Sequence, residues 1–179
     1  MNRAIKTLFT VIFALAVLIL VVGILLPSSY TVERSVVIEA SPDEVHKYVG
    51  DLKKWEEWTP WKEDDPTIVV TYGEETKGVG ASQYWVGDSG TGSLTFTKDS
   101  PDEGVEYDLT FDGGAYECKS AMRYNPLSDN ETKVTWTMAG DMGQSIVGGY
   151  LVLMMDSMVG GMFDKGLSNL KNKVEQNKQ

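Results

Sequence analysis

Residues 51–61 read DLKKWEEWTPW, and this stretch separates two different parts of the sequence. The segment Leu52–Trp58 is expected to form a short helix that ends near Pro60, because proline cannot continue a helical hydrogen-bond ladder. Its tryptophans recur at intervals of three, at Trp55, Trp58 and Trp61. Two interpretations of the indole rings stay open: a lid that meets a ligand, or large aromatic side chains that cap one end of a hydrophobic core.

Upstream of this stretch, the sequence predicts one strand and one helix. Val32, Val36 and Ile38 alternate with polar residues, which is the period of a half-buried strand. Residues 41–44 read SPDE, a capping box with proline at the first helical position. A helix should therefore begin at this point.

Downstream, six segments with a period of two predict a meander of antiparallel strands. They are Ile68–Tyr72, Ala81–Val86, Leu94–Phe96, Val105–Phe111, Cys118–Tyr124 and Val134–Met138. Residues 87–90 read GDSG and predict a hairpin turn after the second segment. The period then changes, and a long helix is expected from about Ile146 to Glu175, with an amphipathic second half.

A run without charged residues extends from Leu8 to Leu26. As a helix it would span about 28 Å, close to the hydrocarbon thickness of a bilayer. Arg3 and Lys6 precede the run and no acidic residue does, so the amino terminus is expected in the cytoplasm and the rest of the chain outside the inner membrane. The alternatives are a cleaved signal peptide and a buried helix of a soluble protein. A signal peptide normally has a shorter apolar core and a better cleavage site than Pro27–Tyr30.

The sequence therefore predicts a single-pass anchor over residues 1–27, followed by one domain over residues 28–179. Two of the 16 basic residues and none of the 26 acidic residues precede Pro27, so this domain is more acidic than the whole chain, whose net charge is −10. Such a surface repels phosphate backbones, and no nucleic-acid partner is expected. With Cys118 as the single cysteine and His46 as the single histidine, we expect no metal site, no cofactor and no catalytic constellation.

The order of strand, two short helices, six-stranded meander and long helix resembles the helix-grip fold of the START-like superfamily. This superfamily is also called SRPBCC, or the polyketide cyclase/dehydrase and lipid-transport proteins. The stretches that carry the resemblance read YTVERS (30–35), ASPDEV (40–45), DLKKWEEWTPW (51–61), GVGA (78–81), TKVTW (132–136) and FDKGLSNLK (163–171). The resemblance implies an α+β fold in which a curved antiparallel sheet wraps around the long C-terminal helix and leaves an apolar cavity. It implies no catalytic motif, because the superfamily has none in common.

We predict that a ligand would lie between the long helix and the sheet, with Trp58 and Trp61 near the mouth. The other predicted ligand-binding residues are Tyr84, Trp136, Met138, Met154, Met158 and Met162. Methionine suits a cavity that admits varied apolar shapes, because its thioether side chain is flexible. Glycines at 148, 149, 160 and 161 weaken the helix, which suggests a close backbone approach or room beside it. The alternative is a solid core.

Three further expectations concern single features. The apolar segment 146–163 is expected to be buried between the sheet and a lid, because Asp156 makes a second membrane span unfavourable. Asp156 is expected to reach a polar partner or the surface, and His46 to lie on a solvated face. Cys118 is expected to be a core residue, since no histidine is placed to activate it as a nucleophile.

The predicted function is a membrane-tethered module that binds a hydrophobic or lipid-like small molecule and is not an enzyme. Two other functions remain open. One is a cyclase or dehydratase of the same fold that uses Asp or Tyr side chains in the cavity. The other is a non-catalytic domain that binds a partner through the apolar first half of the long helix.

Overall fold

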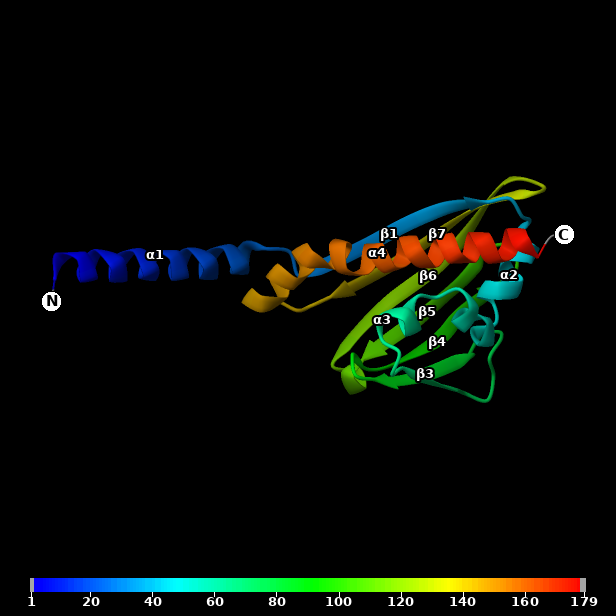
Figure 1. The fold of residues 1–179 in the computed structure, drawn as a ribbon, viewed down its shortest axis with the longest axis horizontal. Coiled ribbons are helices and arrows are strands. Elements are labelled where there is room, and N and C mark those ends of the chain that lie inside the picture. Colours follow the sequence, from blue (N-terminus) through cyan, green and yellow to red (C-terminus); the bar gives the residue numbers. More distant parts are fainter. Residues whose placement is uncertain (1, 178–179) are drawn as a thin grey trace.

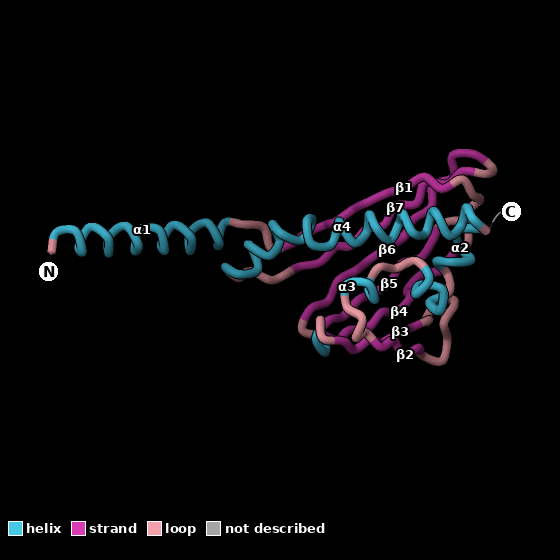
Figure 2. The backbone as a smooth tube through the Cα atoms, in the orientation of Figure 1, coloured by secondary structure: helices cyan, strands magenta, loops and turns pink. Residues whose placement is uncertain are grey.

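The computed structural model describes residues 2–177. A straight N-terminal helix projects from a domain in which a second long helix lies along a curved sheet (Figures 1 and 2). The helices are α1 (Arg3–Leu25), α2 (Pro42–Val49), η1 (Leu52–Glu57), α3 (Trp61–Asp64), η2 (Asp112–Gly114) and α4 (Ile146–Gln176). The strands are β1 (Ser29–Ile38), β2 (Val69–Tyr72), β3 (Ser82–Gly87), β4 (Gly90–Ser100), β5 (Gly104–Phe111), β6 (Tyr116–Ser128) and β7 (Glu131–Asp141).

The seven strands form one antiparallel sheet in the order β1-β7-β6-β5-β4-β3-β2. The last six strands follow one another as a meander, and β1 joins the sheet beside β7. The helices α2, η1 and α3 connect β1 to β2 at the opposite edge of the sheet. The predicted α+β helix-grip fold is therefore confirmed.

The capping box starts α2 as predicted. The hydroxyl of Ser41 accepts a hydrogen bond from the backbone N–H of Glu44, and the Glu44 carboxylate accepts one from the backbone N–H of Ser41. These reciprocal bonds satisfy donors that a helix start otherwise leaves unpaired. They place the start of α2 immediately after β1.

The alternation of each strand separates an inner face, turned toward α4, from an outer face. Trp136 lies opposite Met122 on β6 and opposite Arg34 on β1, and residues directly opposite in an antiparallel pair share a face. Trp136 also stacks on Phe163 of α4, with ring centroids 4.1 Å apart and planes 6° apart. The inner face is thus the one that carries Arg34, Met122 and Trp136.

The tryptophans of residues 51–61 pack around Trp136. The ring centroids of Trp58 and Trp61 lie 5.5 Å and 6.1 Å from that of Trp136, both in edge contacts. Trp55 and Trp58 are almost fully buried, and their indole N–H groups donate to backbone carbonyls of α2. Trp55 and Trp58 are therefore core residues, whereas Trp61 keeps part of its surface exposed.

The first half of α4 corrects one expectation. We expected it to be buried between the sheet and a lid, but Val147, Leu153, Met154 and Met158 are all more than half exposed. Apart from α1, which contacts its start, no described element covers the outer side of this half, because the short helices α2 and α3 lie over other parts of the domain (Figure 1). Both α1 and α4 are long and apolar enough to cross a membrane by length and composition alone.

Candidate ligand-binding site

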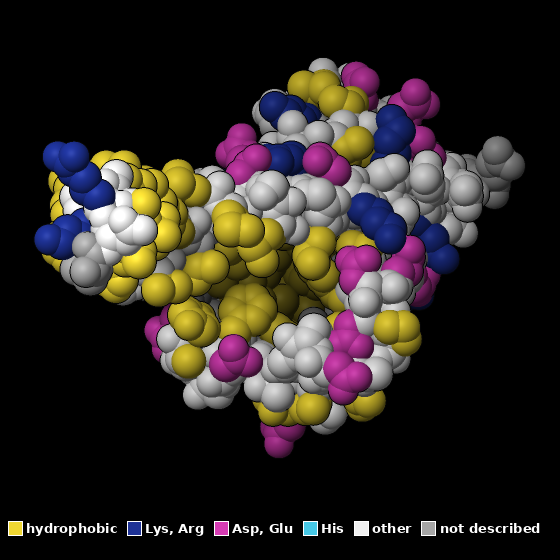
Figure 3. Space-filling model, turned by 60° about the vertical axis from the view of Figure 1, so that its left-hand side comes forward, with side chains coloured by type: hydrophobic (Ala, Val, Ile, Leu, Met, Phe, Trp, Pro, Cys, Tyr) yellow, Lys and Arg dark blue, Asp and Glu magenta, His cyan; other side chains and the backbone are white. Residues whose placement is uncertain are grey.

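The end of the domain that carries α1 has a hollow lined with hydrophobic side chains (Figure 3). In this view α1 projects at the left, and the hollow opens between α4 and the half of the sheet that contains β2 to β5. Several hydrophobic side chains pack on the core and stay partly exposed, and we take its candidate lining from among them. They are Tyr30, Val36, Tyr48, Trp61, Tyr72, Trp85, Leu109, Phe111, Met142 and Val159.

The aromatic core forms the inner limit of this hollow. Trp136 donates a hydrogen bond from Nε1 to the hydroxyl of Tyr107 at 2.8 Å, so both polar groups are satisfied inside the core. Trp85 meets Phe111 edge-on, with ring centroids 5.7 Å apart. Close-packed rings fill the half of the domain near α2, which leaves the open space at the end near α1.

The structure brings together only part of the predicted site. Trp58 and Trp61 each contact Trp136, and Met138 belongs to the same hydrophobic cluster. Met154 and Met158 lie on the exposed surface of α4, whereas Met155, which is not among the predicted ligand-binding residues, is buried. Met162 is half-buried.

Tyr84 lies apart from the other predicted residues. It pairs with Thr71 and Ser93 on the outer face of the sheet and is 47% exposed. Its neighbour Trp85 is the residue that faces inward, toward Phe111. The strand pairing gives the reason: Gly92 lies opposite Trp85 and leaves room for its ring, since a Cβ at Gly92 would come within 2.1 Å of the indole.

A polar clamp fixes the middle of α4 to β1. Arg34 donates from Nη1 and Nη2 to the two carboxylate oxygens of Asp156, at 2.8 Å and 3.0 Å, and from Nε to Asp164 at 3.1 Å. The hydrogen bonds from Arg34 lower the pKa of Asp156 below its usual value. Asp156 therefore has the polar partner that we expected. Gly160 leaves the space for this guanidinium, since a Cβ there would lie 2.1 Å from Nη2.

His46 corrects another expectation, because it does not lie on a solvated face. Its Nε2 lies 3.0 Å from Oδ1 of Asp99, and its Nδ1 lies 3.2 Å from the hydroxyl of Tyr124. Asp99 also accepts a hydrogen bond from the backbone N–H of Gly78. These contacts tie α2 to β4 and β6, so the histidine has a structural place in the fold.

Cys118 is buried on the inner face next to Tyr30, as expected for a core residue. Burial raises the pKa of its thiol to about 11 and also raises the pKa of the Tyr30 hydroxyl. Both groups are therefore neutral at pH 7.

We expect Cys118 to resist alkylation in the folded protein. A thiol pKa raised from 9.0 to about 11 lowers the thiolate fraction at pH 8 by about 100-fold, and the thiolate is the reactive form. The rate of reaction with a disulfide reagent should rise at least that much when the full chain is denatured. Equal rates in the folded and denatured protein would contradict the burial of this thiol.

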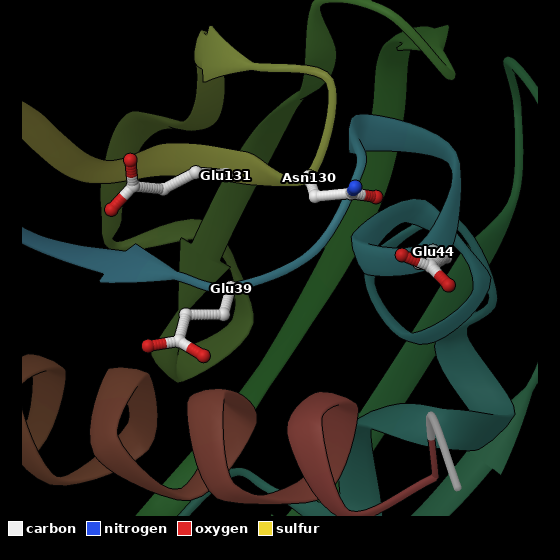
Figure 4. A pocket seen from close by; sticks show the side chains of 4 residues that line it. All are labelled: Glu39, Glu44, Asn130 and Glu131. Atoms are coloured by element: carbon white, nitrogen blue, oxygen red, sulfur yellow. The ribbon is translucent and has the colours of Figure 1, made fainter.

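A second depression lies at the opposite end of the domain, beyond the end of β1 (Figure 4). It is lined by Glu39, Glu44, Asn130 and Glu131, has a volume of about 620 Å³ and is open to solvent. In Figure 4 the four side chains come from α2, from the end of β1 and from the β6–β7 turn, and they do not converge on a point. Among residues 2–177, no group of three or more His, Cys, Asp or Glu side chains is placed to hold a metal ion. This acidic depression does not suit an apolar ligand.

Comparisons with known proteins agree with the architecture. The family model of polyketide cyclase/dehydrase and lipid transport proteins matches residues 29–175. The chain is similar to the Zhui aromatase/cyclase from Streptomyces sp. R1128, with 15% identity, a TM-score of 0.62, and coverage of 84% of this chain and 97% of that chain. No curated protein matches the chain.

Two further solved structures have the same fold. A Thermobifida fusca protein, solved by NMR in solution, is 19% identical with a TM-score of 0.61, over 82% of this chain and 93% of that chain. Norcoclaurine synthase from Thalictrum flavum was solved as a point mutant in complex with a transition-state analogue. It is 11% identical with a TM-score of 0.62, over 84% of this chain and 97% of that chain. At these identities the likeness shows the fold alone, whereas the family match covers nearly all of the chain after α1. The chain therefore belongs to the polyketide cyclase/dehydrase and lipid transport family.

Proposed function

We propose that this protein is a membrane-tethered module that binds a hydrophobic or lipid-like small molecule in the hollow beside α4. The observation that carries the proposal is the gathering of hydrophobic side chains around an open hollow at the α1 end of the domain (Figure 3). A concave, mostly apolar site of this kind binds ligands through buried apolar surface.

The tether is the second part of the proposal. The side chains of α1 are apolar and exposed over the uncharged run, and only three residues separate Leu25 from Ser29, the first residue of β1. With Arg3 and Lys6 on the cytoplasmic side, the domain would stand outside the inner membrane. A linker this short keeps the hollow close to the bilayer.

Binding without catalysis fits the ionisable groups of the inner face. Arg34, Asp156 and Asp164 are bonded to one another. The pKa values of Tyr30 and Cys118 are raised by burial, which makes both groups weak acids at neutral pH. A cyclase or dehydratase needs an acid or base whose pKa lies near the working pH.

The proposal is tested by identifying what the protein carries. The full chain, purified in nanodiscs, is extracted and analysed by mass spectrometry beside a Val159→Trp variant, in which the larger side chain occupies the hollow. We expect one class of apolar compound in stoichiometric amount with the parent protein and a loss of most of it with Val159→Trp. Val79→Trp, at an exposed loop position, is the matched control and should leave the amount unchanged.

The result that would overturn the proposal is an equal lipid complement for the parent and for Val159→Trp, since nanodisc lipid alone would then explain the extract. If the protein turned over a substrate, and this activity were lost when one ionisable group of the inner face is replaced, the result would instead support a cyclase or dehydratase. A melting temperature measured on each variant shows whether the fold is kept.

A further inference from the structure

The start of α4 lies directly beside the last two turns of α1. Gly149 faces Leu26 and Gly23: a Cβ at Gly149 would lie 2.7 Å from the Leu26 Cβ and 2.9 Å from the Gly23 carbonyl oxygen. The hydroxyl of Tyr150 donates a hydrogen bond to the carbonyl oxygen of Ile19 at 2.8 Å. Ile19 precedes Leu26 by seven residues, which corresponds to about 10 Å along a helix. The start of α4 therefore lies alongside the C-terminal end of α1, at the same level along the axis of that helix.

This part of the chain is also uncharged and exposes apolar side chains. No charged residue occurs from Met142 to Met155, between Asp141 and Asp156. Val147 is 68% exposed and Leu153 is 59% exposed. A helix face turned to water normally carries polar and charged residues. These exposed apolar side chains belong to the part of α4 that packs beside α1.

Two backbone N–H groups in the first turn of α4 are paired within the protein. The hydroxyl of Ser145 accepts from the N–H of Gly148 at 2.9 Å, and the carbonyl of Ser145 accepts from the N–H of Gly149 at 3.0 Å. Tyr150 uses its hydroxyl on α1. Such pairing matters in lipid, where no water is present to bond an exposed backbone group.

We propose that the first half of α4, residues 146–155, inserts into the leaflet at the C-terminal end of α1, so that the hollow opens onto lipid. The bilayer is the occupant of the exposed apolar face because α1, which packs beside this face at Gly149 and Tyr150, exposes apolar side chains along its uncharged run. Asp156, held by Arg34, marks the point where α4 leaves the lipid. If the hollow opens onto lipid, a ligand can enter it from the bilayer. This part of the inference rests on the proposed function, whereas the insertion of α4 does not.

The experiment measures the surroundings of single nitroxide labels on the full chain in phosphatidylcholine nanodiscs. Cys118→Ala removes the native thiol, and Val147→Cys and Leu153→Cys introduce one label each. Ile12→Cys on α1 is the lipid-exposed reference. Leu127→Cys is the water-exposed reference, an exposed apolar position near the β6–β7 turn, at the end of the domain away from α1 (Figure 1). Collision rates with oxygen, which concentrates in lipid, and with a water-soluble nickel chelate are recorded.

We expect the ratio of oxygen to nickel collisions at positions 147 and 153 to approach that at position 12 and to exceed that at position 127 several-fold. Nickel collisions as frequent at 147 and 153 as at 127 would overturn the insertion. Protection from both reagents, together with spin–spin broadening, would also overturn it and indicate a second copy on this face. This readout needs no ligand, so its failure is distinct from failure of the lipid extraction.

Discussion

Replacing Trp136 with alanine should lower the free energy of unfolding by about 3–5 kcal/mol, which makes it one of the two most damaging single changes that we expect. Trp136 is only 1% exposed, and its ring meets Trp55, Trp58, Trp61 and Phe163. Alanine would leave a cavity at the point where η1, α3, the sheet and α4 join. Denaturant unfolding followed by far-UV circular dichroism measures the loss.

Trp136→Phe is the control for this change. It keeps an aromatic ring against Phe163 but removes the indole N–H that donates to the hydroxyl of Tyr107. Because this variant keeps much of the ring contact, we expect a clearly smaller loss than with alanine. Equal losses for the two variants would show that the hydrogen bond, and not the packing of the rings, determines the stability at this position.

Gly104→Ala should be comparably damaging, for a reason that lies in the backbone. Gly104 starts β5 with φ of +101°, where side chains with a Cβ are strained by about 1–3 kcal/mol. A Cβ there would also lie 1.9 Å from the carbonyl oxygen of Met122 on the neighbouring strand. The strand pair β5–β6 would have to separate locally to relieve the contact. The loss is measured by the same denaturant titration.

Substitutions at two other glycines separate the effect of backbone strain from that of the clash with Met122. Gly78 has φ of +79°, and a Cβ added there would have no other atom within 4 Å, so Gly78→Ala should show the cost of the backbone conformation alone. Gly161 lies in α4 with open space around it, so Gly161→Ala should stabilise the protein by up to about 1 kcal/mol. A Gly104→Ala loss no larger than that of Gly78→Ala would contradict the clash with Met122.

The candidate site shows where sequence reasoning stopped. Periodicity located β3 correctly, but Tyr84 and Trp85 are adjacent aromatic residues, and only the pairing of Trp85 with Gly92 decides which of them faces inward. The same holds on α4, where four methionines share one helical segment. Packing against the sheet buries Met155 and leaves Met154 and Met158 at the surface.

Contacts between residues far apart in the chain could not be predicted. His46 meets Asp99 and Tyr124 because α2 folds back over β4 and β6. The glycines of α4 were noticed in the sequence, but their reasons differ: Gly149 admits α1, whereas Gly160 admits Arg34. Each reason depends on a partner more than 100 residues away.

The sequence by itself determined the order of the elements, the antiparallel meander, the capping box of α2 and the uncharged run of α1. All of these depend on local patterns, which neighbouring residues carry in full. Only the tertiary structure decided that Trp55, Trp58 and Trp136 fill the core, that the hollow opens at the α1 end, and that the first half of α4 is exposed beside α1. These features depend on which faces of the helices and strands pack together after folding. The apolar character of a residue does not specify which other element will cover it.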